Sequence, residues 1–272
     1  MKFFRYIWES YVVLYLLILY APILFLAIFA FNASVTPAFP LKGFTTQWFA
    51  QMTESRQLVD ALWNSLKVAT SVSIISTILG GLAAKAIARK RLPGKGVIAG
   101  LLGLPLIVPA VVIGIALLIL LSSVGLPLSL NAIRAAHVLF CIPFAMLVML
   151  PRFEAVDPSL EEASRDLGEG LFMTFVRVVA PMSAPAIIAS LLLTFTVSLD
   201  EFMLAFFLAG NETTLPLFIW SQLRFPGRLP SVLALSTCIL VFSFVLVGVA
   251  EWFRRLGNRN IRRNGEADVY LD

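Results

Sequence analysis

The sequence predicts an all-α protein that crosses a membrane six times. Of its 272 residues, 59% are hydrophobic and only 14% are charged, whereas soluble domains carry about a quarter charged residues. The charged residues are also clustered, because none occurs between Glu9 and Lys42 or between Lys95 and Arg134. A membrane-spanning helix needs about 20 mostly apolar residues. These uncharged stretches are long enough to supply such helices.

The apolar stretches predict a single transmembrane domain over 1–272. Its predicted spans are 11–31, 62–86, 97–121, 132–151, 184–209 and 231–253. The first is too long for a signal peptide and lacks a convincing small-residue cleavage site, so we expect it to be retained. Prolines lie in or beside three of the spans, namely Pro105, Pro109, Pro143 and Pro185. They indicate either kinked helices around a pathway or irregular packing.

Basic residues predict the orientation of the spans, since lysine and arginine in short loops mark the cytoplasmic side. The stretch that begins at the end of the second span contains Lys85, Arg89, Lys90, Arg91 and Lys95, and no acidic residue. Basic residues also lie at the N-terminus and directly after the sixth span. Both termini and the segment 152–183 are therefore predicted to be cytoplasmic. The basic tail follows a membrane helix directly, so we expect it to contact lipid and not nucleic acid.

The segment 152–183 is the one long charged interruption of the apolar sequence. A short helix is predicted from Pro158, capped by Asp157 or Ser159, with acidic residues in its first turn and Gly168 after its end. A second helix, 172–180, is predicted to end at Pro181. The segment therefore reads as a helical hairpin that projects from the inner membrane face. A solvated amphipathic linker is the alternative.

The hairpin carries a recognisable spacing. Glu162-Ala163-Ser164 is followed by Gly168 and, further on, by Val178-x-Ala180-Pro181. This spacing resembles the EAA loop of ABC importer permeases, whose pattern is Glu-Ala-Ala, Gly and Ile-x-Leu-Pro. Three positions depart from the pattern, with conservative changes in size. The residues that the resemblance assigns to ATPase coupling are Glu161, Glu162, Ala163, Ser164, Asp166, Leu167, Gly168 and Pro181.

The resemblance implies the type I ABC importer permease fold, in which the hairpin is a coupling helix that docks on a separate ATPase. It further implies two copies of that ATPase, a second, related permease subunit and a periplasmic or lipid-anchored solute-binding protein, at the bacterial inner membrane. ATP and Mg²⁺ would be bound by the ATPase, because this chain lacks the G-x-x-x-x-G-K-[ST] loop that cradles phosphates. No cofactor, metal or catalytic residue is expected in the chain itself.

Three further segments, 32–52, 198–224 and 229–240, resemble the second permease subunit of spermidine/putrescine-type importers. That resemblance implies a small cationic solute such as spermidine or putrescine. Members of the family also carry other small solutes, so an amino-acid-like solute stays open.

Asp200 and Glu201 are adjacent carboxylates in the fifth predicted span. Ionisable residues inside a membrane are costly and face a cavity or a partner. We therefore expect at least one of them to line the substrate path and attract an amine. The alternative is a structural salt bridge to Arg134 or Lys67.

Other residues are weaker candidates. His137, the only histidine, suits a packed position with one hydrogen bond better than a proton relay. Trp48 and Phe49 lie in the first outer loop, where they are candidates for contact with a solute-binding protein. Two other functions remain possible, an ion-coupled transporter or channel and an intramembrane enzyme. The enzyme is disfavoured because the sequence shows no nucleophile with a base and no metal cluster.

Overall fold

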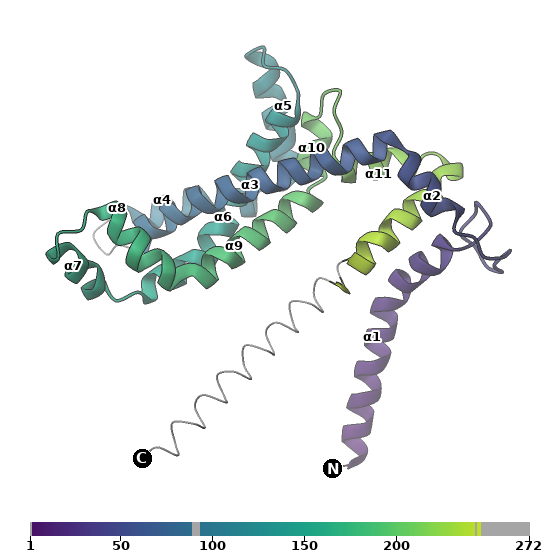
Figure 1. The fold of residues 1–272 in the computed structure, drawn as a ribbon, viewed down its shortest axis with the longest axis horizontal. Helices are drawn as coiled ribbons and strands as arrows, with labels where there is room; N and C mark the ends of the chain where they lie inside the picture. The colour runs from purple at the N-terminus through teal and green to yellow at the C-terminus, as the bar shows by residue number, and fades with distance from the viewer. Residues whose placement is uncertain (1, 89–92, 243, 246–272) are drawn as a thin grey trace. The chain divides into compact units, whose positions relative to one another are not determined.

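The computed structural model describes residues 2–88, 93–242 and 244–245 (Figure 1). The described part of the chain is almost entirely helical, which confirms the predicted all-α fold. Contacts divide the chain into two compact units. Unit 1 comprises Met1–Ser55 with Ser221–Asp272, and unit 2 comprises Arg56–Trp220.

Unit 1 contains the long apolar helix α1 (Lys2–Ala30), the short helix α2 (Gln47–Glu54) and a helix over Pro226–Phe242. The loop between α1 and α2 is folded around Asn32, whose buried side chain accepts hydrogen bonds from the backbone of Ser34 and Lys42. The indole of Trp48 donates a 2.8 Å hydrogen bond to the Asn32 carbonyl. Trp48 is only 6% exposed. It therefore holds the loop together, and almost none of its side chain is exposed for contact with a binding protein.

Unit 2 is built on three long helices that lie side by side in Figure 1, namely α3 (Arg56–Ala88), α6 (Leu130–Ala155) and α9 (Ala180–Asp200). Apolar clusters hold the two ends of this three-helix core. One end packs Val68, Ile133 and Leu204, and the other packs Ala84, Phe153 and Val179. The clusters show that α3 and α6 run in the same direction and α9 runs back.

Small and polar side chains fill the middle of the three-helix core. Gly80 of α3 lies so close to α6 that an added Cβ would sit 2.6 Å from the Cβ of Ala145. The Thr77 hydroxyl is 3.0 Å from that of Ser190 on α9, and both are buried. Small residues and interhelical hydrogen bonds are the usual means by which helices associate in lipid. The core is thus packed as a membrane bundle is packed.

The predicted third span is not one straight helix. It forms α4 (Lys95–Ile107) and α5 (Ala110–Ser123), which meet at a bend of 99°. The cause is Pro109, because the residue before a proline is driven out of the helical conformation. Val108 is accordingly extended, with φ −78° and ψ 126°. Beyond the bend, α5 packs on the short helix α10 (Met203–Leu208).

The predicted fifth span is also interrupted. Its helix α9 ends at Asp200, Glu201 is extended, and α10 follows. The chain then turns closely past Leu128, whose carbonyl oxygen would lie 2.3 Å from a Cβ at Gly210. The next helix is α11 (Leu215–Gln222), whose first amide donates a 2.7 Å hydrogen bond to the Ser65 hydroxyl of α3.

Among the described residues, four helices are long and apolar enough to cross a membrane, or five if the bent pair α4–α5 counts as one span. The four are Trp8–Ala30, Arg56–Ala88, Leu130–Ala155 and Leu171–Asp200. The sixth predicted span, 231–253, lies partly outside the described residues. The number of crossings therefore stays a prediction.

Candidate functional site

The charged segment forms a short helix, α7 (Pro158–Asp166), at one end of unit 2 (Figure 1). The Asp157 carboxylate accepts a 2.9 Å hydrogen bond from the amide of Ser159 and so caps the helix. Gly168 ends the turn with φ +91°, in the left-handed region that favours glycine. Helix start and stop thus follow the predicted signals, with Asp157 as the cap.

Hydrogen bonds from Ser159, mainly from its backbone amide, hold the pKa of the Asp157 carboxyl below its ordinary value. The carboxyl is therefore ionised at neutral pH. Because folding lowers this pKa, the stabilising contribution is present above the ordinary pKa and is lost as the pH falls through the lowered value.

The second helix of the hairpin does not end at Pro181, contrary to the prediction. It runs as α8 (Leu171–Thr174), a π-helical turn (Phe175–Val179) and α9 without a break. Pro181 has no amide hydrogen to donate, but it lies just after the π-helical turn, where the regular bonding of each amide to the carbonyl four residues earlier is already interrupted. Arg152 of α6 donates a 2.9 Å hydrogen bond from Nε to the Met182 carbonyl in the first turn of α9. Pro181 therefore lies inside the helix that continues into the core.

The predicted coupling residues fall on two different faces of α7. Glu161 and Ser164, three positions apart, face the rest of unit 2, where Glu161 forms an ion pair with Lys85 and Ser164 lies 3.2 Å from the Thr174 hydroxyl. The other coupling residues of α7 and its turn are exposed. They are Glu162, Ala163, Asp166, Leu167 and Gly168.

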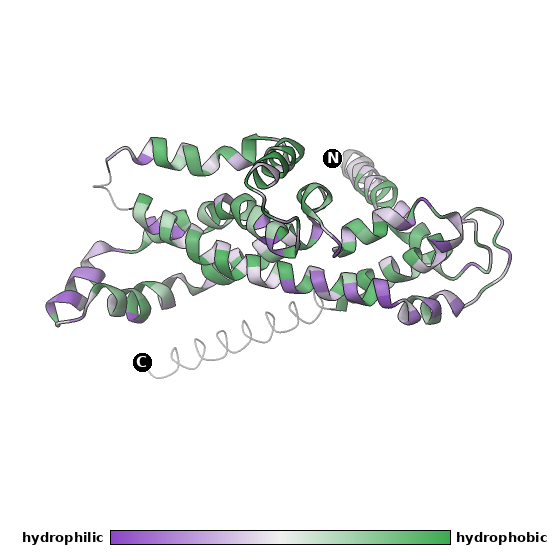
Figure 2. Cartoon of the chain, turned by 90° about the horizontal axis from the view of Figure 1, so that it is seen from above, coloured by the Kyte–Doolittle hydropathy of each residue, from purple (hydrophilic) through white to green (hydrophobic). Residues whose placement is uncertain are grey.

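The exposed face continues into an apolar tip. Leu167 is 87% exposed, Leu171 62% and Phe172 77%. Leu167 directly follows Asp166 in the chain, Leu171 and Phe172 begin α8, and Figure 2 shows hydrophilic residues at this end of unit 2. Exposed apolar side chains rimmed by charges are typical of a protein-binding surface. We call Glu162, Asp166, Leu167, Leu171 and Phe172 the outer face of the hairpin.

Asp200 and Glu201 lie where α9 ends, and they differ in environment. Asp200, the last residue of α9, is exposed. Glu201 is partly buried, and its carboxylate accepts a 3.2 Å hydrogen bond from the Leu204 amide at the start of α10. Within the described residues neither carboxylate pairs with Arg134 or Lys67. The structure therefore gives no support to the salt-bridge alternative.

The break between α9 and α10 concentrates negative charge. The last carbonyl groups of a helix lack intrahelical partners and carry the negative end of its dipole. Asp200 adds a carboxylate at the same point, and it has no ion-pair partner in the part of the chain that the structure describes. Broken helices supply cation sites in membrane transporters for the same reason. The negative charge at the end of α9 is thus complementary to a cation.

His137 is 1% exposed in the three-helix core, and its Nδ1 lies 2.9 Å from the Ser198 hydroxyl. One hydrogen bond in a packed position matches the structural role expected of it. Among the described residues, no group of three or more His, Cys, Asp and Glu side chains is placed to hold a metal ion.

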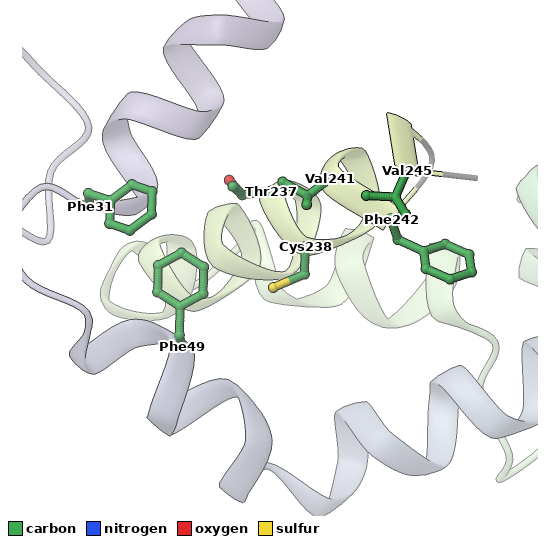
Figure 3. A pocket seen from close by; sticks show the side chains of 7 residues that line it. All are labelled: Phe31, Phe49, Thr237, Cys238, Val241, Phe242 and Val245. Carbon is green, nitrogen blue, oxygen red and sulfur yellow. The ribbon is translucent and has the colours of Figure 1, made fainter. Parts of the chain in front are cut away.

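An apolar groove of about 450 Å³ lies in unit 1 (Figure 3). Phe31 and Phe49 face a helix side that carries Cys238 and Val241. Its lining has no charged residue. A cationic solute would therefore find no charged partner in this groove.

Over residues 76–256 the chain matches the family described as "Binding-protein-dependent transport system inner membrane component". The match covers well over half of the chain, so the chain belongs to this family of inner-membrane transport components. Membership favours transport over the intramembrane enzyme, and transport that depends on a binding protein over an ion-coupled channel.

Relatives within the family are similar along most of their length. The chain is 33% identical over 238 residues to the spermidine/putrescine transport system permease protein PotC of Escherichia coli strain K12, covering 87% of this chain and 89% of that protein. It is 35% identical over 243 residues to the putrescine transport system permease protein PotI of the same strain, covering 86% and 85%.

The fold is shared with a solved transporter. A bacterial ABC transporter involved in the import of the acidic polysaccharide alginate matches with a TM-score of 0.73 and 17% identity, covering 91% of this chain and 96% of that one. At this identity the likeness shows the fold alone.

Sequence reasoning missed the ion pair of Lys85 and treated Lys85 only as a marker of orientation. The sequence nevertheless contained a signal that Glu161 and Glu162 lie on different faces of α7. Residues three or four apart share one face of a helix, so Glu161 belongs with Ser164, and Glu162 with Asp166. The periodicity of α7 thus separates an inner face from an outer one.

We predict that Asp157→Ala speeds amide hydrogen exchange in α7, because it removes the cap. Loss of a cap costs about 0.5–2 kcal/mol, which corresponds to roughly 2- to 30-fold faster exchange at residues 160–166. Asp157→Asn is the matched control, since asparagine also caps, and it should exchange like the wild type. Equal exchange in the alanine and wild-type proteins would contradict the capping role.

Proposed function

We propose that this chain is the permease subunit of an ATP-driven importer that moves polyamines such as spermidine or putrescine into the cytoplasm. The observation that carries the proposal is its 33% and 35% identity to the polyamine permeases PotC and PotI over most of both chains. Fold alone does not set the solute, because the alginate transporter with this fold imports an acidic polymer. The carboxylates at the end of α9 support a cationic one.

In this proposal Asp200 contacts the ammonium group of the solute. Its carboxylate is exposed and has no ion-pair partner among the described residues. Glu201 adds negative charge beside it while it holds the start of α10 through Leu204. A charge-assisted hydrogen bond from an amine to a carboxylate is stronger than a neutral one, so the pair would both attract and orient the solute.

The outer face of the hairpin is the proposed dock for a separate ATPase subunit. Glu162 and Asp166 would pair with basic groups of the ATPase, while Leu167, Leu171 and Phe172 would enter an apolar groove on it. Gly168 allows the tight turn that exposes Leu167. ATP and Mg²⁺ would be bound by the ATPase, and rigid movement of α7 would carry the motion into the spans.

The proposed assembly contains two ATPase copies, a second related permease and a periplasmic or lipid-anchored solute-binding protein. The proposed orientation has both termini in the cytoplasm. It is supported within unit 2, because α7 lies at the same end of the three-helix core as Lys85, which belongs to the basic stretch that begins at the end of the second span. By the positive-inside rule this end faces the cytoplasm, where an ATPase has access to ATP.

We predict that Asp200→Asn raises the KM for spermidine uptake roughly tenfold, because one charge-assisted contact to an ammonium group is lost. Uptake of labelled spermidine by cells that express the full transporter measures this. Asp60→Asn is the matched control, since Asp60 is an exposed carboxylate at the start of α3 without an assigned role. Its KM should stay at the wild-type value. An unchanged KM for Asp200→Asn at normal expression would refute the assigned contact.

We predict that Glu162→Lys reduces co-purification of the ATPase roughly tenfold, because a repulsive charge replaces an attractive one on the outer face. Glu154→Lys carries the same change at an exposed residue of α6 outside that face. It should retain the ATPase at the wild-type level. Retention by both variants would show that the outer face is not the dock.

A further inference from the structure

An ion pair joins α7 to the end of α3. The Lys85 ammonium and the Glu161 carboxylate are in direct contact, and their side chains are only 15% and 16% exposed. Lys85 lies three residues before the end of α3, and Glu161 lies in the first turn of α7. The pair therefore connects the hairpin directly to a helix of the core across 76 residues of sequence.

Lys85 is held in place by its surroundings. Its ammonium nitrogen lies 5.9 Å from the centre of the Phe153 ring of α6, within the range of a cation–π interaction. The neighbouring residues Ala84 and Ile87 are buried in the same apolar cluster as Phe153 and Val179. Removing one member of a mostly buried pair leaves the other charge poorly compensated. The link is thus more than an exposed surface contact.

A second ion pair in the hairpin provides a contrast. Arg177 and Glu169 are in contact, but both belong to the hairpin and their side chains are 63% and 28% exposed. That pair can stiffen the hairpin but does not reach α3. Exposed pairs contribute little to stability. Of these two pairs, the one between Lys85 and Glu161 joins α7 to α3.

We propose that the Lys85–Glu161 pair makes α7 and the end of α3 move as one body, so that motion delivered to the outer face of the hairpin reaches the three-helix core. This inference rests on the proposed function. Glu162 and Asp166 receive the ATPase on one side of α7, while Glu161 and Ser164 pass the movement on from the other. Lys85 and Glu161 are positioning residues for transport, and Glu161 is not a contact of the ATPase.

The proposal predicts uncoupling when the pair is broken. In Lys85→Gln the outer face is intact, so the ATPase still binds and still hydrolyses ATP. Movement of the ATPase then shifts α7 relative to the end of α3, and the three-helix core does not follow. A residue needed only for folding would instead lower the amount of assembled transporter.

The test uses the complete transporter and labelled spermidine. Lys85→Gln should retain the ATPase and its basal hydrolysis, and uptake should fall roughly tenfold. Glu169→Gln, the matched control in the exposed pair, should keep uptake near the wild-type level. The charge swap Lys85→Glu with Glu161→Lys should restore much of the uptake that each single reversal loses. The proposal would be overturned if Lys85→Gln took up spermidine normally or failed to bind the ATPase subunit. It would also be overturned if the charge swap restored no more uptake than the single reversals.

A second measurement does not depend on the solute. Spin labels at exposed Leu82 of α3 and exposed Ser159 of α7, in a Cys238→Ser background, report the distance between the helices. The wild-type complex should give one distribution with and without vanadate-trapped nucleotide, whereas Lys85→Gln should give a broader or shifted one. The proposed link would be wrong if the distance distribution shifted in the wild type, or if it neither broadened nor shifted in Lys85→Gln. A wild-type complex that takes up no spermidine, or binds no ATPase, would instead defeat the proposed function.

Discussion

Close packing of α3 against α6 is the constraint on which the rest of unit 2 depends. Gly80 leaves no room for a side chain between the two helices, and hydroxyls such as Thr77 bond across to α9. In lipid there is little hydrophobic drive between helices, so van der Waals contact and interhelical hydrogen bonds must hold them together. A bundle packed in this way resists sliding between its members. A displacement of the helices at one end of the bundle is therefore expected to displace the other end as well.

The two candidate sites use opposite ends of that bundle. The hairpin is fixed to one end of the bundle through Lys85, Phe153 and the continuous helix from α8 into α9. The carboxylates lie at the other end, where α9 stops at Asp200 and α10 packs on α5 beyond its bend. Rigid packing connects the two ends, and the breaks at Pro109 and Glu201 leave short helices beside the carboxylates.

Much of this could be predicted from sequence, because apolar runs, caps and glycines act locally. Asp157, Pro158 and Gly168 set the bounds of α7, and the EAA-like spacing led to the family that the comparison confirms. Contacts between segments that are distant in the sequence could not be predicted, because no local pattern specifies them. Pro181 was expected to stop a helix that a π-helical turn instead carries onward. Trp48 was a candidate for contact with a solute-binding protein, but its indole donates a hydrogen bond to the Asn32 carbonyl inside the loop. Lys85 was interpreted only as a marker of membrane orientation, and its ion pair with Glu161 was not predicted.

Accumulation of spermidine in proteoliposomes tests the central claim most directly, namely that this chain is a polyamine permease driven by a separate ATPase. The vesicles would contain this chain, its second permease and the ATPase, with the solute-binding protein and labelled spermidine on the side opposite the ATPase. The account predicts that spermidine becomes more concentrated on the ATPase side of the vesicle membrane than on the side of the binding protein. This should happen only when ATP is present on the ATPase side. Accumulation without ATP, or none with every component present, would contradict it.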